Sequence, residues 1–430
     1  MQPEEMKMEI NIAELEAVVW ENVQVKRRVP LLVENIHDWN TCIADKNYLY
    51  CFNNRYYEKI EEIEFCRIFE NAYRINWNDY APNKGKQAYE HLVQKNILTI
   101  FNQPSHLIPF KNGVFNDISK EMEEFNSDYH FISVIPYEYT DDNPDLFLKT
   151  MSEILPVKVD KCKIMKFIRY CLTNSVDYQF GQIWQGGGNN GKTKLAELVA
   201  ELLGDFSTPF DVSRLSTDKG YIVSLRNKQL AICSEIGGSY LNNAAMEQWK
   251  KLITDKLISA RGAYEKPTSW INGTKFIVCT NNLPTLRNNK DRAFFRRWQV
   301  IDFPTDFTGI EDRTLFDRIL KNEGGSILSY LLREINYDDI IPDPWEEVQE
   351  FWLNTSSTVR KYVSEACELD GIGNPETGDL YGDYVEWCNS MDIEPSSKRV
   401  MANDLRRMGI RSKKGYDNIY RYIGISIGDV

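Results

Sequence analysis

Residues 180–203 read FGQIWQGGGNNGKTKLAELVAELL. The apolar run from Phe180 to Trp184 predicts a short buried strand, and the apolar spacing from Lys192 to Leu203 predicts a helix that Gly204 ends. A loop of glycine and asparagine connects the two. Glycine tolerates positive φ angles and lets the backbone come close to a ligand. The stretch therefore predicts a strand, a ligand-binding loop and a helix in direct succession.

The loop matches the pattern G-x-x-x-x-G-K-[ST]. Its residues are Gly186, Gly187, Gly188, Asn189, Asn190, Gly191, Lys192 and Thr193. In this pattern backbone N–H groups surround the phosphate oxygens of a nucleotide, the lysine reaches its β and γ phosphates, and the last hydroxyl binds Mg²⁺. The positive end of the following helix also attracts the phosphates. The flanking strand and helix favour this interpretation over a chance match in a glycine-rich turn.

Helix and strand signals alternate around this loop. A strand-like run occurs at 131–137 and a helical period at 160–173, and after the loop come a strand at 229–233, a helix at 244–253 and a strand at 275–280. Such alternation is typical of an α/β fold with a parallel sheet. We therefore expect a P-loop core of that class.

Two polar residues follow the predicted strands. Glu235 comes after the run Leu230 to Cys233, where P-loop enzymes carry an acid that holds Mg²⁺ or positions the attacking water. Residue 234 is Ser, so a paired-acid site is not available. Asn281 ends the next strand, where an amide can bond the γ phosphate. Taken alone, the acid suits a solvated strand end and the asparagine a turn; the preceding loop favours catalytic roles for both.

An arginine pair lies in the sequence DRAFFRRW at 291–298. A guanidinium group that reaches the γ phosphate accelerates hydrolysis by ~10³ or more. Surface ion pairs are the alternative for Arg296 and Arg297. The other motifs favour the catalytic interpretation for this pair.

These motifs, in this order, resemble superfamily 3 (AAA+) helicases, and more closely the phage, plasmid and poxvirus-type primase-helicase family. The segments that carry the resemblance are IWQGGGNNGKTKL, LAICSEIGG, ITDKLISARGAYEKPTSW, KFIVCTNNLP and DRAFFRRWQVIDFP. Weaker similarity extends to 108–114 upstream and to 380–388 downstream. The resemblance is compatible with the helicase portion of a phage primase-polymerase.

The resemblance implies a role for each matching residue. Lys192 and Thr193 are the phosphate and Mg²⁺ residues, Glu235 is the acid of the strand end, and Asn281 is the sensor of the γ phosphate. Arg297 matches the arginine finger of the family better than Arg296, because it directly precedes the strand that begins at Trp298. Such a finger acts on the ATP of the neighbouring subunit, so the resemblance implies a ring, usually a hexamer.

The family also has a β-hairpin that touches DNA in the central channel. Here 257–264 and 268–271 fit its two strands, and Lys266 falls at the tip. Taken alone, a lysine beside proline in a turn suits a solvated tip. The chain departs from the family at 254–256, where Thr-Asp-Lys replaces the usual Gly-Gly-Asp turn.

We predict four parts along the chain. They are a mixed N-terminal helicase-associated domain at 1–150, the ATPase core at 151–305, a helical extension at 306–370 and a basic, winged-helix-like module at 371–430. Basic clustering in the last part suits nucleic acid. The predicted contacts are Arg406, Arg407, Lys413 and Lys414. A basic helix that docks on the acidic remainder of the chain is an equally good alternative.

Composition limits the other possibilities. A net charge of −12 argues against nucleic-acid binding over the whole surface, although it allows a local basic channel. The nine cysteines are scattered without a CxxC pair, so we expect reduced core residues and a cytoplasmic protein, in the host cytoplasm if viral. The acidic N-terminus and the lack of a run of ~18 apolar residues predict neither a signal peptide nor a membrane partner.

Three functions fit the sequence to different degrees. The first is an ATP-dependent DNA helicase in phage or plasmid replication, which moves along single-stranded or forked DNA beside a primase or polymerase. The second is an ATP-driven replication initiator, loader or packaging ATPase without processive unwinding. The third is a DNA-binding scaffold with an inactive nucleotide site, which the lack of a second acid supports. Residues 1–150 contain no carboxylate cluster with a histidine partner that would predict priming activity.

Overall fold

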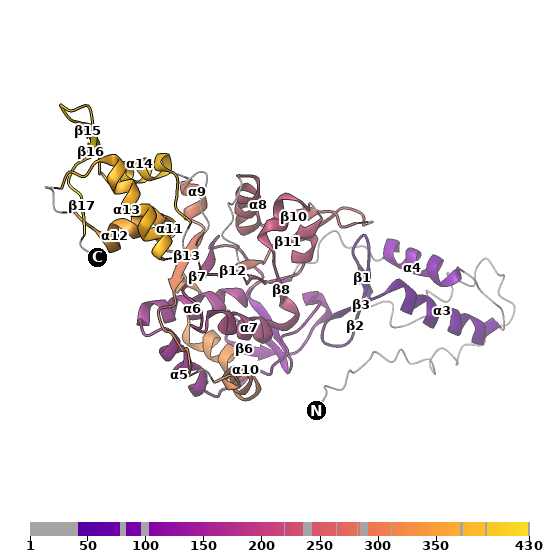
Figure 1. Ribbon diagram of the computed structural model, residues 1–430. Coiled ribbons are helices and arrows are strands. Elements are labelled where there is room, and N and C mark those ends of the chain that lie inside the picture. The colour runs from indigo at the N-terminus through magenta and orange to yellow at the C-terminus, as the bar shows by residue number, and fades with distance from the viewer. Residues whose placement is uncertain are drawn as a thin grey trace.

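A computed structural model describes residues 42–77, 83–95, 103–218, 220–234, 243–263, 265–281, 283, 291–310, 312–369, 373–391 and 394–428 (Figure 1). The following helices and strands lie within these ranges.

A five-stranded parallel sheet forms the centre of the molecule. Its order is β13 (Trp298–Asp302), β7 (Gly181–Gln185), β12 (Lys275–Thr280), β9 (Leu230–Cys233) and β8 (Ser207–Pro209). The central strand β12 is buried along its whole length, as expected for a parallel strand covered on both faces. The structure confirms the predicted α/β class with a parallel sheet.

The register brings three strand ends to one edge of this sheet. Thr280 at the end of β12 pairs with Gln185 at the end of β7, and Val278 pairs with Cys233 at the end of β9. The glycine-rich loop begins directly after Gln185. Asn281, one residue beyond Thr280, therefore lies beside this loop.

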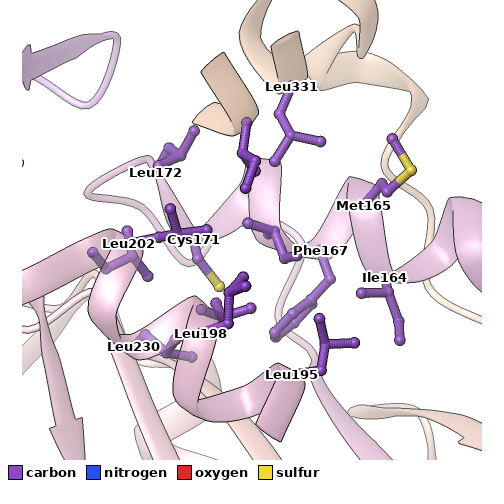
Figure 2. Close-up of a cluster of buried hydrophobic side chains, with 14 of the residues drawn as sticks. Ile164, Met165, Phe167, Cys171, Leu172, Leu195, Leu198, Leu202, Leu230 and Leu331 are labelled. Atoms are coloured by element: carbon purple, nitrogen blue, oxygen red, sulfur yellow. The ribbon is translucent and has the colours of Figure 1, made fainter. Parts of the chain in front are cut away.

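One face of the sheet is covered by four helices. They are α5 (Asp145–Ile154), α6 (Lys158–Cys171), α7 (Lys192–Leu203) and α10 (Leu315–Glu334). Figure 2 shows Phe167 and Cys171 of α6 pointing toward the leucines of α7, with Leu331 of α10 closing the cluster from the other side. The helix α7 has the predicted bounds and ends at Gly204, whose φ of 54° is in the left-handed region.

The opposite face carries a cluster rich in tryptophan. Helices α8 (Asn243–Thr254), α9 (Arg292–Phe295) and α11 (Trp345–Ser356) cover it. Trp249 of α8 packs against Trp298 of β13, with ring centroids 4.6 Å apart. Figure 1 shows these helices on the side of the sheet away from α5, α6 and α10.

Segments before the sheet pack into its core. The strands β4 (Leu107–Phe110), β5 (Gly113–Asn116) and β6 (Glu121–Glu123) form an antiparallel sheet. Its buried residues Ile108, Phe110 and Phe115 join the cluster that contains α6 and α7. The prediction of a strand at 131–137 is wrong. That segment is not assigned as a strand and holds its place by single backbone hydrogen bonds, such as that from Ile135 N to Pro109 O at 2.8 Å.

A small N-terminal module precedes these strands. It consists of β1 (Cys42–Ala44), β2 (Leu49–Phe52), β3 (Tyr57–Ile60), α3 (Glu62–Trp77) and α4 (Lys84–Lys95). The three strands form an antiparallel sheet in chain order, and the two helices cover one of its faces through a separate apolar core.

The C-terminal module contains three helices followed by a hairpin. A cluster that runs from Val359 to Ile425 holds these elements together. Its elements are α12 (Thr358–Ala366), β14 (Cys367–Glu368), α13 (Thr377–Ser390), α14 (Lys398–Arg407), β15 (Ser412–Lys414), β16 (Tyr420–Tyr422) and β17 (Ser426–Ile427). The helix α14 is rich in basic residues and lies within the predicted basic module.

The remaining short elements connect these parts. The hairpin β10 (Leu257–Ala260) and β11 (Thr268–Ile271) is antiparallel, as predicted. The 3₁₀ turns are η2 (Ser127–Tyr129), η3 (Gly204–Phe206), η4 (Val212–Ser216), η5 (Tyr221–Leu225) and η6 (Tyr337–Asp339). No helix among the described residues is both long and apolar enough to cross a membrane.

The packed cores do not follow the predicted division of the chain. One apolar cluster runs from Ile108 to Ile340, across residues 150 and 305. The C-terminal cluster begins at Val359, before residue 371. The four-part division remains a prediction about domain organisation.

Two cysteines correct the expectation that all nine are reduced. Cys42 and Cys51 face each other across β1 and β2, and a disulfide joins them. The residues are nine apart in sequence, so the bond closes the base of the hairpin that β1 and β2 form. The other seven cysteines all lie in the described ranges and are not joined in disulfides. The sequence spacing carried no sign of this pairing because the strands were not predicted.

We predict that a thiol titration will detect this bond. The full chain, unfolded in denaturant without reductant, should expose seven reactive thiols, because two of the nine cysteines are joined. Reduction before unfolding should raise the number to nine. Nine thiols in the unreduced sample would contradict the disulfide.

Candidate nucleotide-binding site and nucleic-acid contacts

The glycine-rich loop has a backbone that only glycine allows at two positions. A Cβ at Gly186 would lie 2.3 Å from Asn190 Nδ2 and 2.7 Å from Phe303 O. Gly191 has a φ of 82° and directly precedes α7. Gly187 and Gly188 have no heavy atom within 4 Å of a Cβ position, so open space lies beside them. The loop is thus tightly packed at its start and open at its middle.

Lys192 lies at the centre of this loop. Its side chain is only 6% exposed, and Nζ donates to Gly186 O at 3.1 Å and to Gly187 O at 3.0 Å. Nζ also donates to Asn281 Oδ1, at 2.6 Å. The structure therefore brings together the predicted phosphate-binding lysine and the predicted sensor, which are 89 residues apart in sequence.

A segment that sequence reasoning missed holds the loop from outside. Asn190 Nδ2 donates to Phe303 O at 3.2 Å, and Phe307 N donates to Asn189 O at 2.9 Å. Asn189 Nδ2 also donates to Thr308 Oγ1 at 3.1 Å. These partners follow β13, the strand next to β7. The contacts fix the loop because backbone and amide groups bond at both of its asparagines.

Thr193 is exposed at the start of α7 and borders a cavity of about 230 Å³. Ser234 and Cys279 line the same cavity. Burial raises the pKa of Cys279 to about 12, although the charge of Lys192 acts in the opposite direction. The thiol is therefore protonated near neutral pH. The cavity connects the hydroxyl predicted to bind Mg²⁺ with the end of β9.

The predicted acid Glu235 lies outside the described residues. The residue before it, Ser234, is exposed at the end of β9, next to the end of β12. Among the described residues no group of three or more His, Cys, Asp or Glu could hold a metal ion. The role of Glu235 stays a prediction.

Arg297 lies at the amino-terminal ends of the strands, opposite the end that carries the glycine-rich loop. It directly precedes β13, and its carbonyl accepts from Gly181 N at the start of β7, at 2.9 Å. The five residues of β7 separate it from the loop, a distance of about 16 Å along a strand. Its side chain is 9% exposed and donates to Ala293 O, and burial lowers its pKa. Arg296, in contrast, is exposed.

The predicted DNA-contacting lysine is at the tip of the β10–β11 hairpin. Lys266 has an exposed side chain. Its backbone is not free, because Lys266 N donates to Asn47 Oδ1 at 2.8 Å and Lys266 O accepts from Asn47 Nδ2 at 3.2 Å. The hairpin tip thus contacts the N-terminal module, which sequence reasoning did not predict.

The four predicted cations of the tail are exposed. Lys413 and Lys414 lie on β15, and Arg406 lies at the end of α14. Arg407 is paired with Asp404 at 2.9 Å, within the same helix. An ion pair inside one exposed helix is weak. All four side chains are accessible to a binding partner in solution.

Two known families match parts of the chain. Residues 78–156 match the family described as D5 N terminal like, and residues 184–297 match a family of unknown function, DUF5906. A protein of Acanthamoeba polyphaga mimivirus, provisionally named a helicase, is 26% identical over 265 residues, which are 58% of this chain and 27% of that protein. A protein of African swine fever virus, provisionally named a primase, is 23% identical over 428 residues, 89% of this chain and 42% of that protein.

The chain resembles the phage and viral primase-helicases. It spans less than half the length of these two viral relatives. The fold is also similar to the apo structure of the C-terminal region of NrS-1, with a TM-score of 0.53 and 12% identity. That similarity covers 93% of this chain and 100% of the solved one. The DUF5906 match begins in β7 and ends at Arg297, so the matched segment of this chain contains the loop, the hairpin and Asn281.

We predict that Gly186→Ala destabilises the core while Gly187→Ala does not. The added methyl group at Gly186 would collide with Asn190 and Phe303, whereas at Gly187 it meets open space. Overpacking of this kind costs about 1–3 kcal/mol, and an exposed change lies within about 0.5 kcal/mol. Calorimetric melting temperatures of the two variants would test this. Equal melting temperatures would mean that the loop can relax around the methyl group.

Proposed function

We propose that this chain is an ATP hydrolase that acts as a DNA helicase in phage or viral replication. The observation that carries the proposal is the 2.6 Å bond between Lys192 Nζ and Asn281 Oδ1 at the carboxyl edge of the parallel sheet. Ligands of such sheets bind beyond the carboxyl ends of the strands. A cation and an amide that converge there, beside a glycine-rich loop, suit a triphosphate.

The loop residues fit a nucleotide in a specific way. The open space beside Gly187 and Gly188 suits phosphate oxygens, which backbone N–H groups of residues 186–191 would bind. Lys192 would exchange its carbonyl partners for the β and γ phosphates. Asn281 would then be released to bond the γ phosphate or the attacking water. Both groups are already within reach of each other.

Mg²⁺ is the metal that this donor set suits, since it prefers oxygen ligands and shares them with phosphates. The Thr193 hydroxyl and the Glu235 carboxylate would bind the Mg²⁺ ion, which would neutralise part of the phosphate charge. Thr193 fits this role because it is exposed beside the 230 Å³ cavity that Ser234 also lines. Glu235 would orient and polarise the attacking water.

Assembly into a ring, as the family resemblance implies, agrees with the position of Arg297. The residue is about 16 Å of strand away from the loop of its own chain, on the opposite edge of the sheet. An arginine finger in this position has to serve the nucleotide of a neighbouring subunit. We therefore propose a closed ring, with a hexamer as the expected state, in which each Arg297 completes the site next to it.

DNA is the proposed second substrate. Lys266 at the hairpin tip, together with Arg406, Arg407, Lys413 and Lys414, would bind the phosphates of single-stranded or forked DNA. The helices α12 to α14 and the β15–β16 hairpin suit a winged-helix module. Because the chain spans less than half of its viral relatives, we propose that a primase or polymerase domain or protein works beside it, in the host cytoplasm.

Lys192→Ala should abolish both ATP hydrolysis and DNA unwinding. The change removes the charge that neutralises the β and γ phosphates. Lys194→Ala is the matched control, because Lys194 is on the same helix, is exposed and pairs with Glu197 at 2.7 Å. Phosphate release and strand separation would be measured for both variants. Hydrolysis by a folded Lys192→Ala protein at the rate of the control would refute the nucleotide site.

Arg297→Ala should bind ATP and fail to hydrolyse it. Mixed with Lys192→Ala subunits in one ring, it should regain part of the turnover, because some interfaces then combine an intact loop with an intact finger. Arg296→Ala is the control for loss of a neighbouring charge. Mixed rings without activity above that of either variant, together with a linear loss when Arg297→Ala is titrated into wild type, would exclude action on a neighbour.

A further inference from the structure

The turn between β1 and β2 contacts the tip of the β10–β11 hairpin through side chains. The carboxamide of Asn47 bonds both the N–H and the C=O of Lys266, at 2.8 and 3.2 Å. Next to it, the hydroxyl of Tyr48 donates to Glu265 Oε1 at 2.5 Å. In Figure 1 the hairpin tip reaches toward β1. The contacts join residues 217 to 219 positions apart, so they are tertiary contacts between two separate parts of the fold.

The turn is itself held rigidly. Asp45 Oδ1 accepts from Asn47 N and from Tyr48 N, both at 2.7 Å, which closes the turn. The other carboxylate oxygen, Oδ2, accepts from Tyr50 and lies 3.3 Å from a guanidinium nitrogen of Arg226. Arg226 follows η5 and belongs to the ATPase core. The turn therefore connects two points of the core, the end of η5 and the hairpin tip.

These contacts also place the two charged residues at the tip, Glu265 and Lys266, differently. The hydrogen bond with Glu265, aided by burial, raises the pKa of Tyr48 to about 12, so the phenol keeps its proton. The same hydrogen bond holds the carboxylate of Glu265 against the N-terminal module. In solution this carboxylate would repel a phosphate. Toward the described residues, the neighbouring Lys266 is bonded through its backbone alone, and its side chain is exposed. Among the described residues no acidic group is paired with the Lys266 ammonium.

We infer that the turn at 45–48 is a brace that positions the hairpin tip, so that Lys266 is presented to nucleic-acid phosphates while Glu265 is held back. Asn47 and Tyr48 are the positioning residues. The inference rests on the proposed function, in which Lys266 contacts DNA. The alternative is that the turn blocks the tip from DNA. A blocking segment would cover the ammonium group of Lys266, whereas the side chain of Lys266 is exposed here.

Hydrogen–deuterium exchange on the full chain tests the brace without any DNA. The amide of Lys266 is bonded to Asn47, so Asn47→Ala should speed exchange in peptides covering 262–270 on the order of tenfold. Asn71→Ala is the control, because Asn71 lies on α3 of the same module and bonds the exposed Arg74. Equal exchange at the tip in Asn47→Ala and Asn71→Ala would overturn the brace.

DNA-stimulated ATP hydrolysis tests its consequence. With single-stranded oligodeoxythymidylate as the probe, Asn47→Ala and Tyr48→Phe should raise the half-saturating DNA concentration several-fold and keep the rate at saturating DNA. Asn71→Ala should match wild type. A lower half-saturating concentration in Asn47→Ala would mean that the turn blocks the tip, and the inference would fall.

Lys266→Ala separates failure of the inference from failure of the proposed function. If Lys266→Ala loses DNA stimulation and Asn47→Ala does not, the hairpin binds DNA and the brace is refuted. If Lys266→Ala retains full stimulation, the proposed DNA contact is refuted, and with it the role of the brace in presenting Lys266. In that case faster exchange in Asn47→Ala would still establish the contact itself.

Discussion

Lys192 carries a positive charge and is largely buried, with 6% of the residue exposed. A buried charge is tolerated only where oxygen atoms surround it. Here the oxygens come from the carbonyl groups of Gly186 and Gly187 and from the amide of Asn281. The bond to Asn281 requires β12 to end beside β7, in the register that pairs Thr280 with Gln185. The loop, the strand order and the position of the sensor are therefore linked through one side chain.

Local signals were sufficient for the central part of the fold. The helix α7 has the predicted bounds because its apolar period is regular and Gly204 ends it with a positive φ of 54°, which favours glycine. The strand β12 also has its predicted bounds, since six consecutive residues are buried and polar residues follow them. Lys192 and Asn281 were predicted to belong to one nucleotide site, and they are in contact. The reason is that the carboxyl ends of neighbouring parallel strands meet at one edge of the sheet. The helical extension predicted at 306–370 was less precise, because the sequence did not give the bounds of its longest helix, α10.

Other parts depend on partners far away in sequence. The bond between Asn47 and Lys266 involves a turn residue with no distinctive neighbourhood and a hairpin tip 219 positions later. The support of the loop by Phe303 and Thr308 arises only because β13 pairs with β7. The disulfide between Cys42 and Cys51 follows from a strand register that the irregular N-terminal sequence did not reveal. The apolar periodicity of a sequence indicates which face of a helix or strand is buried. It does not identify the residues against which that face packs.

The strand order also has a consequence for how the chain reaches this fold during synthesis. β7 is made at residues 181–185, yet its two neighbours are β12 at 275–280 and β13 at 298–302. Until about a hundred further residues have left the ribosome, the edges of this apolar strand have no partner. Parallel pairings between distant segments fold slowly and expose strand edges to aggregation. The nascent chain is thus most vulnerable between synthesis of the glycine-rich loop and synthesis of β13, and slower translation would lengthen that interval.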